Sequence, residues 1–145
     1  MDKSKSFLEL KVIWNDHEII QLQITASNGK FCGKTEMYEI PACLYDFAEK
    51  LTNHPKSGEK LSYSPSIRTG YDFFSMKYYL INDTGKLGIE IIIDSQSEYF
   101  VDVKDSVKLE IVVEPNAIKS FQKELQTLAK KENGKAKIYG IDSII

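Results

Sequence analysis

Alternation of apolar and polar side chains along several segments restricts the fold of this chain more than any other feature. Between residues 18 and 27, Ile20, Leu22 and Ile24 alternate with polar residues. A period of two predicts a β-strand with one buried face. Composition and patterning of the same kind predict further strands at residues 6–14, 30–38, 61–67, 71–82, 87–94, 98–104 and 107–114. The tail 135–145 is expected to add an edge strand.

Two other segments repeat their apolar residues at helical spacing. In the first, Leu44, Phe47 and Leu51 follow one another at intervals of three or four residues, as on one face of a helix. The second segment carries Ile118, Phe121, Leu125 and Leu128 in the same way. We therefore expect amphipathic helices at about 41–53 and 115–132, each opened by a proline whose fixed φ suits the first turn.

The order of these elements is three strands, a helix, about five strands and a second helix. Most strands are joined by short turns, which implies antiparallel pairing because parallel neighbours need a long crossover. The sequence therefore predicts an α+β fold, with a predominantly antiparallel, twisted β-sheet of about seven to eight strands and the two helices covering one face. No linker-like tract interrupts the 145 residues, so we expect a single domain spanning 1–145.

The charge and hydropathy of the chain argue against two classes of partner. The formal net charge is −2, and Arg68 is the single arginine. Because domains that bind nucleic acid usually carry a basic excess, no nucleic-acid partner is expected. No apolar run approaches the roughly 20 residues that cross a bilayer, and the N-terminus lacks the apolar region of a signal peptide. We expect a cytoplasmic protein without membrane association.

Residue types that carry chemistry are few and scattered. Neither His17 nor His54 has metal-ligating residues at zinc spacing. The spacing of Cys32 and Cys43 leaves a disulfide open, although two free thiols are favoured for a reducing compartment. No phosphate-binding or nucleophile-elbow motif occurs. The sequence thus predicts no catalytic residue, no metal ligand and no cofactor, and a protein that is not an enzyme.

Charge is unevenly distributed in the second half of the chain. Residues 90–114 contain seven carboxylates and two lysines, a net charge of −5, whereas residues 115–137 carry a net charge of +4. Ordinary solvated strand faces are one interpretation of this contrast. The functional alternative is an acidic sheet face that attracts a basic partner. The candidate contact residues on that face are Glu90, Asp94, Asp102 and Glu110.

The stretch from Leu22 to Leu51 has a distinctive order: a hydrophobic strand, an aromatic-small-Gly step, an acidic and aromatic bend, and a helix with Leu and Phe anchors. This order resembles the WapI-type bacterial immunity proteins and allied uncharacterised bacterial domains. The matching residues are Phe31, Cys32, Gly33, Glu36, Tyr38, Leu44, Phe47 and Leu51. The likeness continues through the later strands to the helix EPNAIKSFQKELQTL.

The resemblance implies a binding protein that neutralises a cognate toxin by occupying it, with no chemistry of its own. Toxins of the nuclease type have basic active sites, so the implied partner is a basic protein toxin and the implied contact surface is the acidic face 90–114. The alternative is a small-ligand-binding β-domain. Its apolar pocket would be lined by Phe73, Tyr78 or Tyr79.

Overall fold

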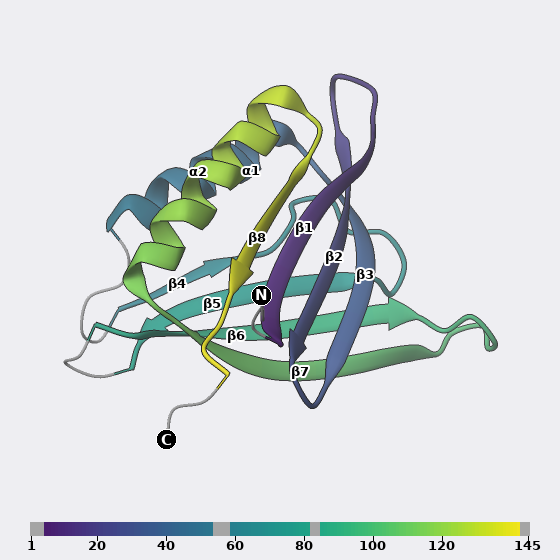
Figure 1. Cartoon of the computed structure of the whole chain (residues 1–145). Coiled ribbons are helices and arrows are strands. Elements are labelled where there is room, and N and C mark those ends of the chain that lie inside the picture. Colours follow the sequence, from purple (N-terminus) through teal and green to yellow (C-terminus); the bar gives the residue numbers. More distant parts are fainter. Residues whose placement is uncertain (1–4, 54–58, 82–84, 143–145) are drawn as a thin grey trace.

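A computed structural model describes residues 5–53, 59–81 and 85–142, which form eight strands and two α-helices (Figure 1). The strands are β1 (Ser6–Asn15), β2 (Ile20–Asn28), β3 (Cys32–Glu39), β4 (Lys60–Tyr63), β5 (Phe73–Leu80), β6 (Leu87–Gln96), β7 (Lys104–Val113) and β8 (Lys135–Tyr139). The helices are α1 (Pro41–Lys50), extended by the 3-10 turn η1 (Leu51–Asn53), and α2 (Pro115–Lys131).

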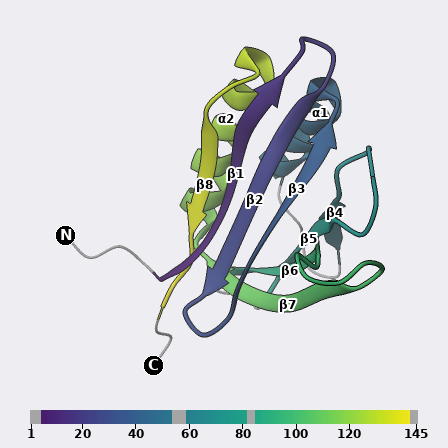
Figure 2. The same ribbon diagram turned by 90° about the vertical axis from the view of Figure 1, so that its right-hand side faces the viewer.

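The strands divide between two antiparallel sheets. Sheet A has the order β3-β2-β1-β8, and sheet B has the order β4-β5-β6-β7. The strands of sheet A cross those of sheet B at a steep angle (Figures 1 and 2). The predicted α+β class, strand number and antiparallel pairing are confirmed. The division into two sheets was not predicted, because short turns specify which neighbours pair but not where a sheet ends.

One apolar core lies between the two sheets and the helices. Ile24 of β2 and Ile89 of β6 point into it and have no exposed surface. Both helices lie on the side of sheet A that also faces sheet B, where they fill the space that sheet B leaves open (Figure 2). The ring centres of Phe47 in α1 and Tyr63 in β4 lie 4.8 Å apart, so the helix layer also contacts sheet B.

A proline begins each helix, as the sequence predicted. Helix α2 ends where Glu132 adopts a left-handed φ of 54°, which turns the chain back toward β8. The tail strand is confirmed as β8, which pairs with β1 at one edge of sheet A. Within residues 5–53, 59–81 and 85–142, no helix is long and apolar enough to span a bilayer.

Two strand predictions need correction. Only the first part of the segment predicted at 61–67 is extended, because β4 ends at Tyr63. The segment predicted as a strand at 98–104 is a hairpin loop except for Lys104, the first residue of β7: the chain turns between Ser97 and Val103, whose backbones share a hydrogen bond of 2.9 Å. Tyr, Phe and Val favour strands, but the antiparallel pairing of β6 with β7 requires the chain to reverse at this position.

Candidate protein-binding surface

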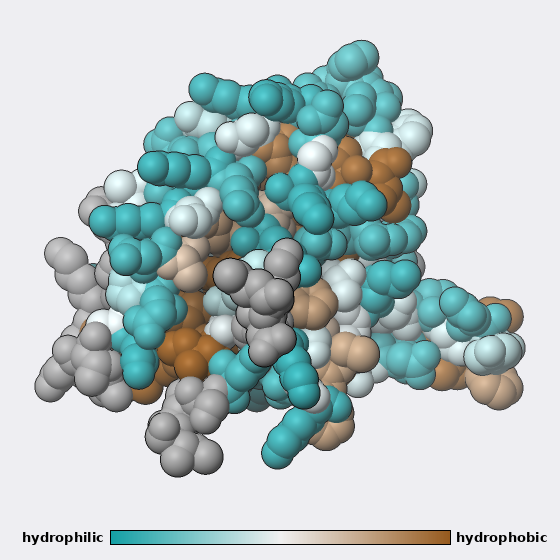
Figure 3. Space-filling model, viewed as in Figure 1, coloured by the Kyte–Doolittle hydropathy of each residue, from teal (hydrophilic) through white to brown (hydrophobic). Residues whose placement is uncertain are grey.

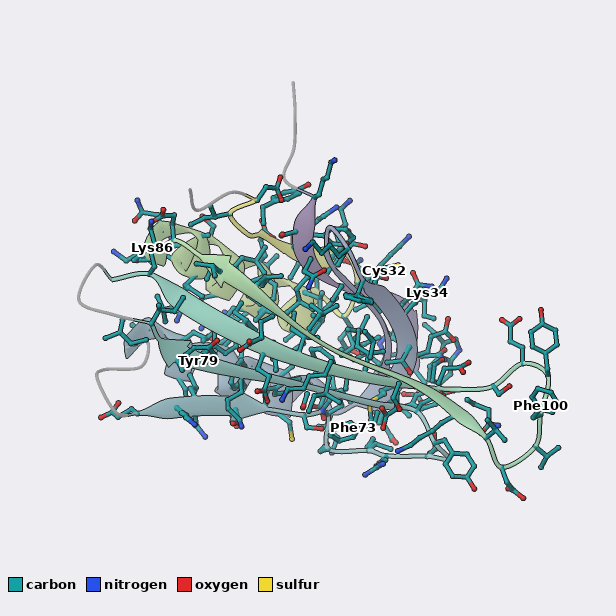
Figure 4. The ribbon with its side chains drawn as sticks, turned by 90° about the horizontal axis from the view of Figure 1, so that it is seen from below. Cys32, Lys34, Phe73, Tyr79, Lys86 and Phe100 are labelled. Atoms are coloured by element: carbon teal, nitrogen blue, oxygen red, sulfur yellow. The ribbon has the colours of Figure 1, made fainter. Side chains whose placement is uncertain are left out.

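The outer face of sheet B carries three of the four predicted contact residues. Even-numbered residues of β6 and β7 point away from the core, so Glu90, Asp94 and Glu110 share this face. Figure 4 views the molecule from the side of sheet B, where Phe73 and Tyr79 of the neighbouring strand β5 are labelled. The fourth residue, Asp102, lies outside the sheet, in the loop between β6 and β7.

Lysines are interleaved with the acidic residues of the outer face. Glu90 lies directly across from Glu110, a pair of like charges that would destabilise the sheet if it stood alone. The Nζ atoms of Lys77 and Lys108 lie 3.6 and 3.5 Å from the carboxylate oxygens of Glu90. The hydroxyl of Tyr79 donates a hydrogen bond to Glu110. Each carboxylate of this pair therefore has a partner within the sheet.

Tyr79 packs its ring against a glycine on the next strand. A Cβ atom added to Gly88 would lie only 2.3 Å from Cζ of Tyr79, so the ring occupies the space that a side chain would need. Burial of the phenol, together with its hydrogen bond to Glu110, raises the pKa of Tyr79 to about 12. The hydroxyl thus stays protonated and holds Glu110 against the sheet.

Asp94 is the most buried of the predicted contact residues, with 7% of its surface exposed. Its carboxylate lies 3.0 Å from Nζ of Lys104. Burial by itself raises the pKa of Asp94, but hydrogen bonds from Ser106 and Lys104 and the charges of Lys104 and Arg68 outweigh it, so the pKa lies below its ordinary value. The outer face of sheet B is therefore a charge-matched surface rather than a uniformly acidic one.

Beyond this face, β6 and β7 extend past the rest of the sheet as a two-stranded arm, which we define as residues 95–105. The pairing of β5 with β6 stops at Phe73 and Asp94, whereas β6 and β7 continue to pair from Ser95 onward. Figures 1 and 4 show the arm projecting from the body of the molecule, with Phe100 at its far end.

Hydrogen bonds within the arm hold its loop in one conformation. The side-chain amide of Gln96 donates to the carbonyl oxygens of Phe100 and Val103, at 3.3 and 3.2 Å. The hydroxyl oxygen of Ser97 accepts hydrogen bonds from the backbone N–H groups of Tyr99 and Phe100. Asp102 adopts a left-handed φ of 62°, which completes the turn.

Two contacts brace the arm against the segment that precedes β5. The backbone N–H of Gln96 donates to Asp72 at 2.9 Å, and the hydroxyl of Tyr71 donates to Asp102 at 3.3 Å. Tyr71 and the arm together line a shallow hollow of about 290 Å³. The direction of the arm is therefore set by side chains as well as by the strand pairing.

The apolar side chains at the tip of the arm face solvent. Tyr99, Phe100 and Val101, which we call the tip, are 85%, 65% and 86% exposed. Figure 3 shows hydrophobic residues at the end of the projection, whereas most of the visible surface of the molecule is hydrophilic. Single exposed apolar residues are common, but three adjacent ones on an ordered projection are typical of interaction sites.

Exposed carboxylates flank the tip. They are Glu98, Asp102 and Asp105, the arm carboxylates, and the single basic residue of the arm, Lys104, contacts Asp94. No ion pair to any of the three occurs within the described part of the chain. Sequence analysis selected Asp102 but missed the tip. The available signal was the apolar run 99–101, which interrupts the alternation seen in true strands.

A second cluster of polar groups, which is buried, lies at the end of β3. Glu39 has no exposed surface, and its carboxylate accepts hydrogen bonds from the hydroxyl of Tyr63 at 2.6 Å and the backbone N–H of Ile40 at 2.8 Å. Ser66 also donates to it through both its N–H and its hydroxyl. Burial and the neighbouring carboxylate raise the pKa of Tyr63. This closed cluster fastens the segment after β4 to β3.

The remaining residues of chemical interest stay apart. Cys32 and Cys43 are both free thiols, as favoured from the sequence. His17 lies in the turn between β1 and β2 with a φ of 72°, whereas His54 lies outside the described residues. In residues 5–53, 59–81 and 85–142, no group of three or more His, Cys, Asp or Glu side chains is placed to hold a metal ion.

The three aromatic residues proposed to line a ligand pocket lie on opposite faces of β5. Tyr78 points into the core and is fully buried, with its hydroxyl donating to the sulfur of Met76 at 3.1 Å. Phe73 and Tyr79 point outward, and the guanidinium of Arg68 stands 4.6 Å from the ring centre of Phe73. Because successive strand residues alternate in direction, these three side chains do not line one pocket.

No protein-family model, curated protein or solved structure matches this chain.

Proposed function

We propose that this chain is a cytoplasmic binding protein of the immunity type, which neutralises a basic bacterial toxin by direct binding and performs no chemistry itself. The observation that carries the proposal is the ordered arm, whose tip exposes Tyr99, Phe100 and Val101 between carboxylates. Aromatic residues are enriched among those that dominate protein–protein binding energy. A loop that is already ordered before binding also loses less conformational entropy when the partner arrives.

A protein partner accounts for this surface better than an enclosed small ligand does. The core-facing side of β5 is filled, since Phe74, Met76 and Tyr78 have no exposed surface. The arm instead offers a convex surface, which suits insertion into another macromolecule. Small-molecule sites are usually concave and enclose most of the ligand. The ligand-binding alternative therefore has less support from the geometry.

Co-production with a toxin tests the proposal directly. A candidate toxin domain, sought among the genes next to this reading frame, would be expressed in a sensitive bacterium, with and without this chain, and growth would be followed. We expect growth to be rescued and the purified proteins to form a complex measurable by calorimetry. Absence of both rescue and binding would refute the proposed function. A catalytically inactive toxin variant serves as the control for toxicity and should bind equally well.

Charge reversal then tests the surface predicted from the sequence. Replacing Glu90, Asp94, Asp102 and Glu110 with lysine should slow association with the toxin, and the slowing should shrink at high salt because ions screen exposed charges. Stopped-flow fluorescence at two ionic strengths measures the rate. Unfolding curves must accompany it, because Asp94 is largely buried. An unchanged association rate in a folded variant would remove these residues from the contact surface.

A further inference from the structure

We infer that the tip inserts into an apolar socket on the partner protein, and that the arm carboxylates pair with lysine or arginine side chains on the rim of that socket. The inference rests on the proposed function for the existence of a protein partner. The arm carries the two elements of such a contact in one ordered loop. The tip supplies the apolar centre, and Glu98, Asp102 and Asp105 supply the charged surround. Interfaces commonly combine a buried aromatic anchor with a polar rim.

The tip is placed for insertion because nothing in residues 5–53, 59–81 and 85–142 packs over it. Its three side chains are more exposed than the other large apolar residues near the arm, such as Val103 at 44%. The backbone beneath them is held by Gln96 and Ser97. The apolar side chains thus point outward from a loop in which several backbone groups are already hydrogen-bonded. Binding through this tip requires little rearrangement of the arm.

The negative charge around the tip indicates that the rim of the socket is basic. Among the described residues no ion pair involves an arm carboxylate, and Lys104, the lysine within the arm, contacts Asp94 instead. An approaching basic rim would therefore find carboxylates that do not have to leave an ion pair. Complementary charges of this kind speed association and set orientation. This separates the arm from the outer face of sheet B, whose carboxylates Glu90 and Asp94 already have lysine partners.

The same charge argues against two other occupants of the tip. An anionic membrane surface would repel the arm carboxylates, although the apolar tip alone would suit a lipid interface. A second copy of this chain meeting tip to tip would bring two sets of like charges together. The observations therefore favour a different protein with basic residues around an apolar depression.

The first experiment compares two matched phenylalanines. Phe100→Ser removes the centre of the tip, and Phe31→Ser removes a similarly exposed ring, 62% against 65%, from the turn between β2 and β3. With the toxin domain as the probe, we expect Phe100→Ser to weaken binding by at least about tenfold, mainly through faster dissociation. Phe31→Ser should leave binding unchanged. Equal effects of the two variants would overturn insertion while leaving the proposed function intact.

Neutral variants of the arm carboxylates test the rim. Glu98→Gln, Asp102→Asn and Asp105→Asn in one chain should slow association several-fold at low salt, and the difference should vanish at high salt. Asn tolerates the left-handed φ of Asp102, so this change preserves the turn. The control chain carries Glu18→Gln, Asp46→Asn and Glu49→Gln, three exposed acidic residues elsewhere. Equal slowing in both chains would show a general charge effect and overturn the rim.

If the toxin domain does not bind, a photo-crosslinking amino acid tests whether the tip inserts into another protein. The crosslinker would replace Val101, or Phe31 as the control, in the full chain produced in the source cell. We expect residue 101 to link to a protein segment rich in apolar and basic residues, and the adduct to weaken in the neutral arm variant. Such an adduct with a protein other than a toxin would sustain insertion and refute the proposed function. No adduct, an adduct with lipid or a second copy, or the same adduct from residue 31 would overturn insertion.

Discussion

The part of the β6–β7 hairpin inside sheet B and the part that forms the arm use similar residues for opposite purposes. Inside the sheet, apolar side chains such as Ile91 face the core, and the carboxylate of Glu90 has lysine partners. In the arm, the tip faces solvent and the arm carboxylates have no ion pair among the described residues. The difference arises because β5 begins at Phe73 and so pairs with β6 no farther than Asp94. Where neighbouring strands stop, the hairpin becomes available to other molecules.

Truncation of an apolar side chain in each part should produce the largest contrast. Ile91→Ala opens a cavity in the core and should lower the free energy of unfolding by about 2–5 kcal/mol. Phe100→Ala in the arm should change it by less than about 0.5 kcal/mol, because its ring is mostly in solvent. Urea denaturation followed by circular dichroism measures both. Comparable losses would mean that the tip packs against the protein in solution.

A side chain added at Gly88 should test how tightly the outer face is packed. Gly88→Val would force the ring of Tyr79 to move, and we expect a loss of about 1–3 kcal/mol in the free energy of unfolding. The control is the same change in a Tyr79→Ala background, where the obstructing ring is absent. If Gly88→Val costs as much in that background as in the parent chain, the ring does not cover the glycine.

The pH dependence of stability should reveal the contribution of the Asp94 carboxylate. The pKa of Asp94 is lowered in the folded state, so its carboxylate stabilises the fold above the ordinary Asp pKa of about 4, and this contribution is lost as the pH falls through the folded value. Asp94→Asn should therefore cost about 1–2 kcal/mol near neutral pH and progressively less below about pH 4. Urea midpoints of the parent chain and of Asp94→Asn between pH 2.5 and 7 measure this loss, and a loss that stays constant over the whole range would contradict the role of the carboxylate.

The smallest effects should come from neutral variants on the outer face. Glu90→Gln with Glu110→Gln should change the association rate with a basic partner by less than about twofold, because Lys77 and Lys108 already offset the nearby charge. The neutral arm variant is the comparison. Rapid-mixing kinetics at low salt measure both chains. A larger effect from the variant with Glu90→Gln and Glu110→Gln would indicate that the contact surface lies on sheet B, as the sequence suggested.

Local patterns in the sequence predicted most of the fold and only part of the candidate surface. Alternation placed Glu90, Asp94 and Glu110 on one face, because a strand's side-chain direction depends only on residue parity. Lys77 joins that face only through the pairing of β5 with β6, which opposes it directly to Glu90. The buried position of Glu39 follows the parity of Met37, although three of its four hydrogen bonds come from Tyr63 and Ser66, more than twenty residues away.

The sequence by itself determined the strand faces, the two helices and their proline starts, because these depend on residue spacing and backbone propensities within one segment. Tertiary structure decided that the strands form two crossed sheets, that lysines neutralise the acidic outer face, and that residues 98–103 form a loop instead of a strand. It also decided the exposure of the tip. A run of Tyr, Phe and Val is buried or exposed according to which other strands extend beside it, and no local pattern records where those strands end.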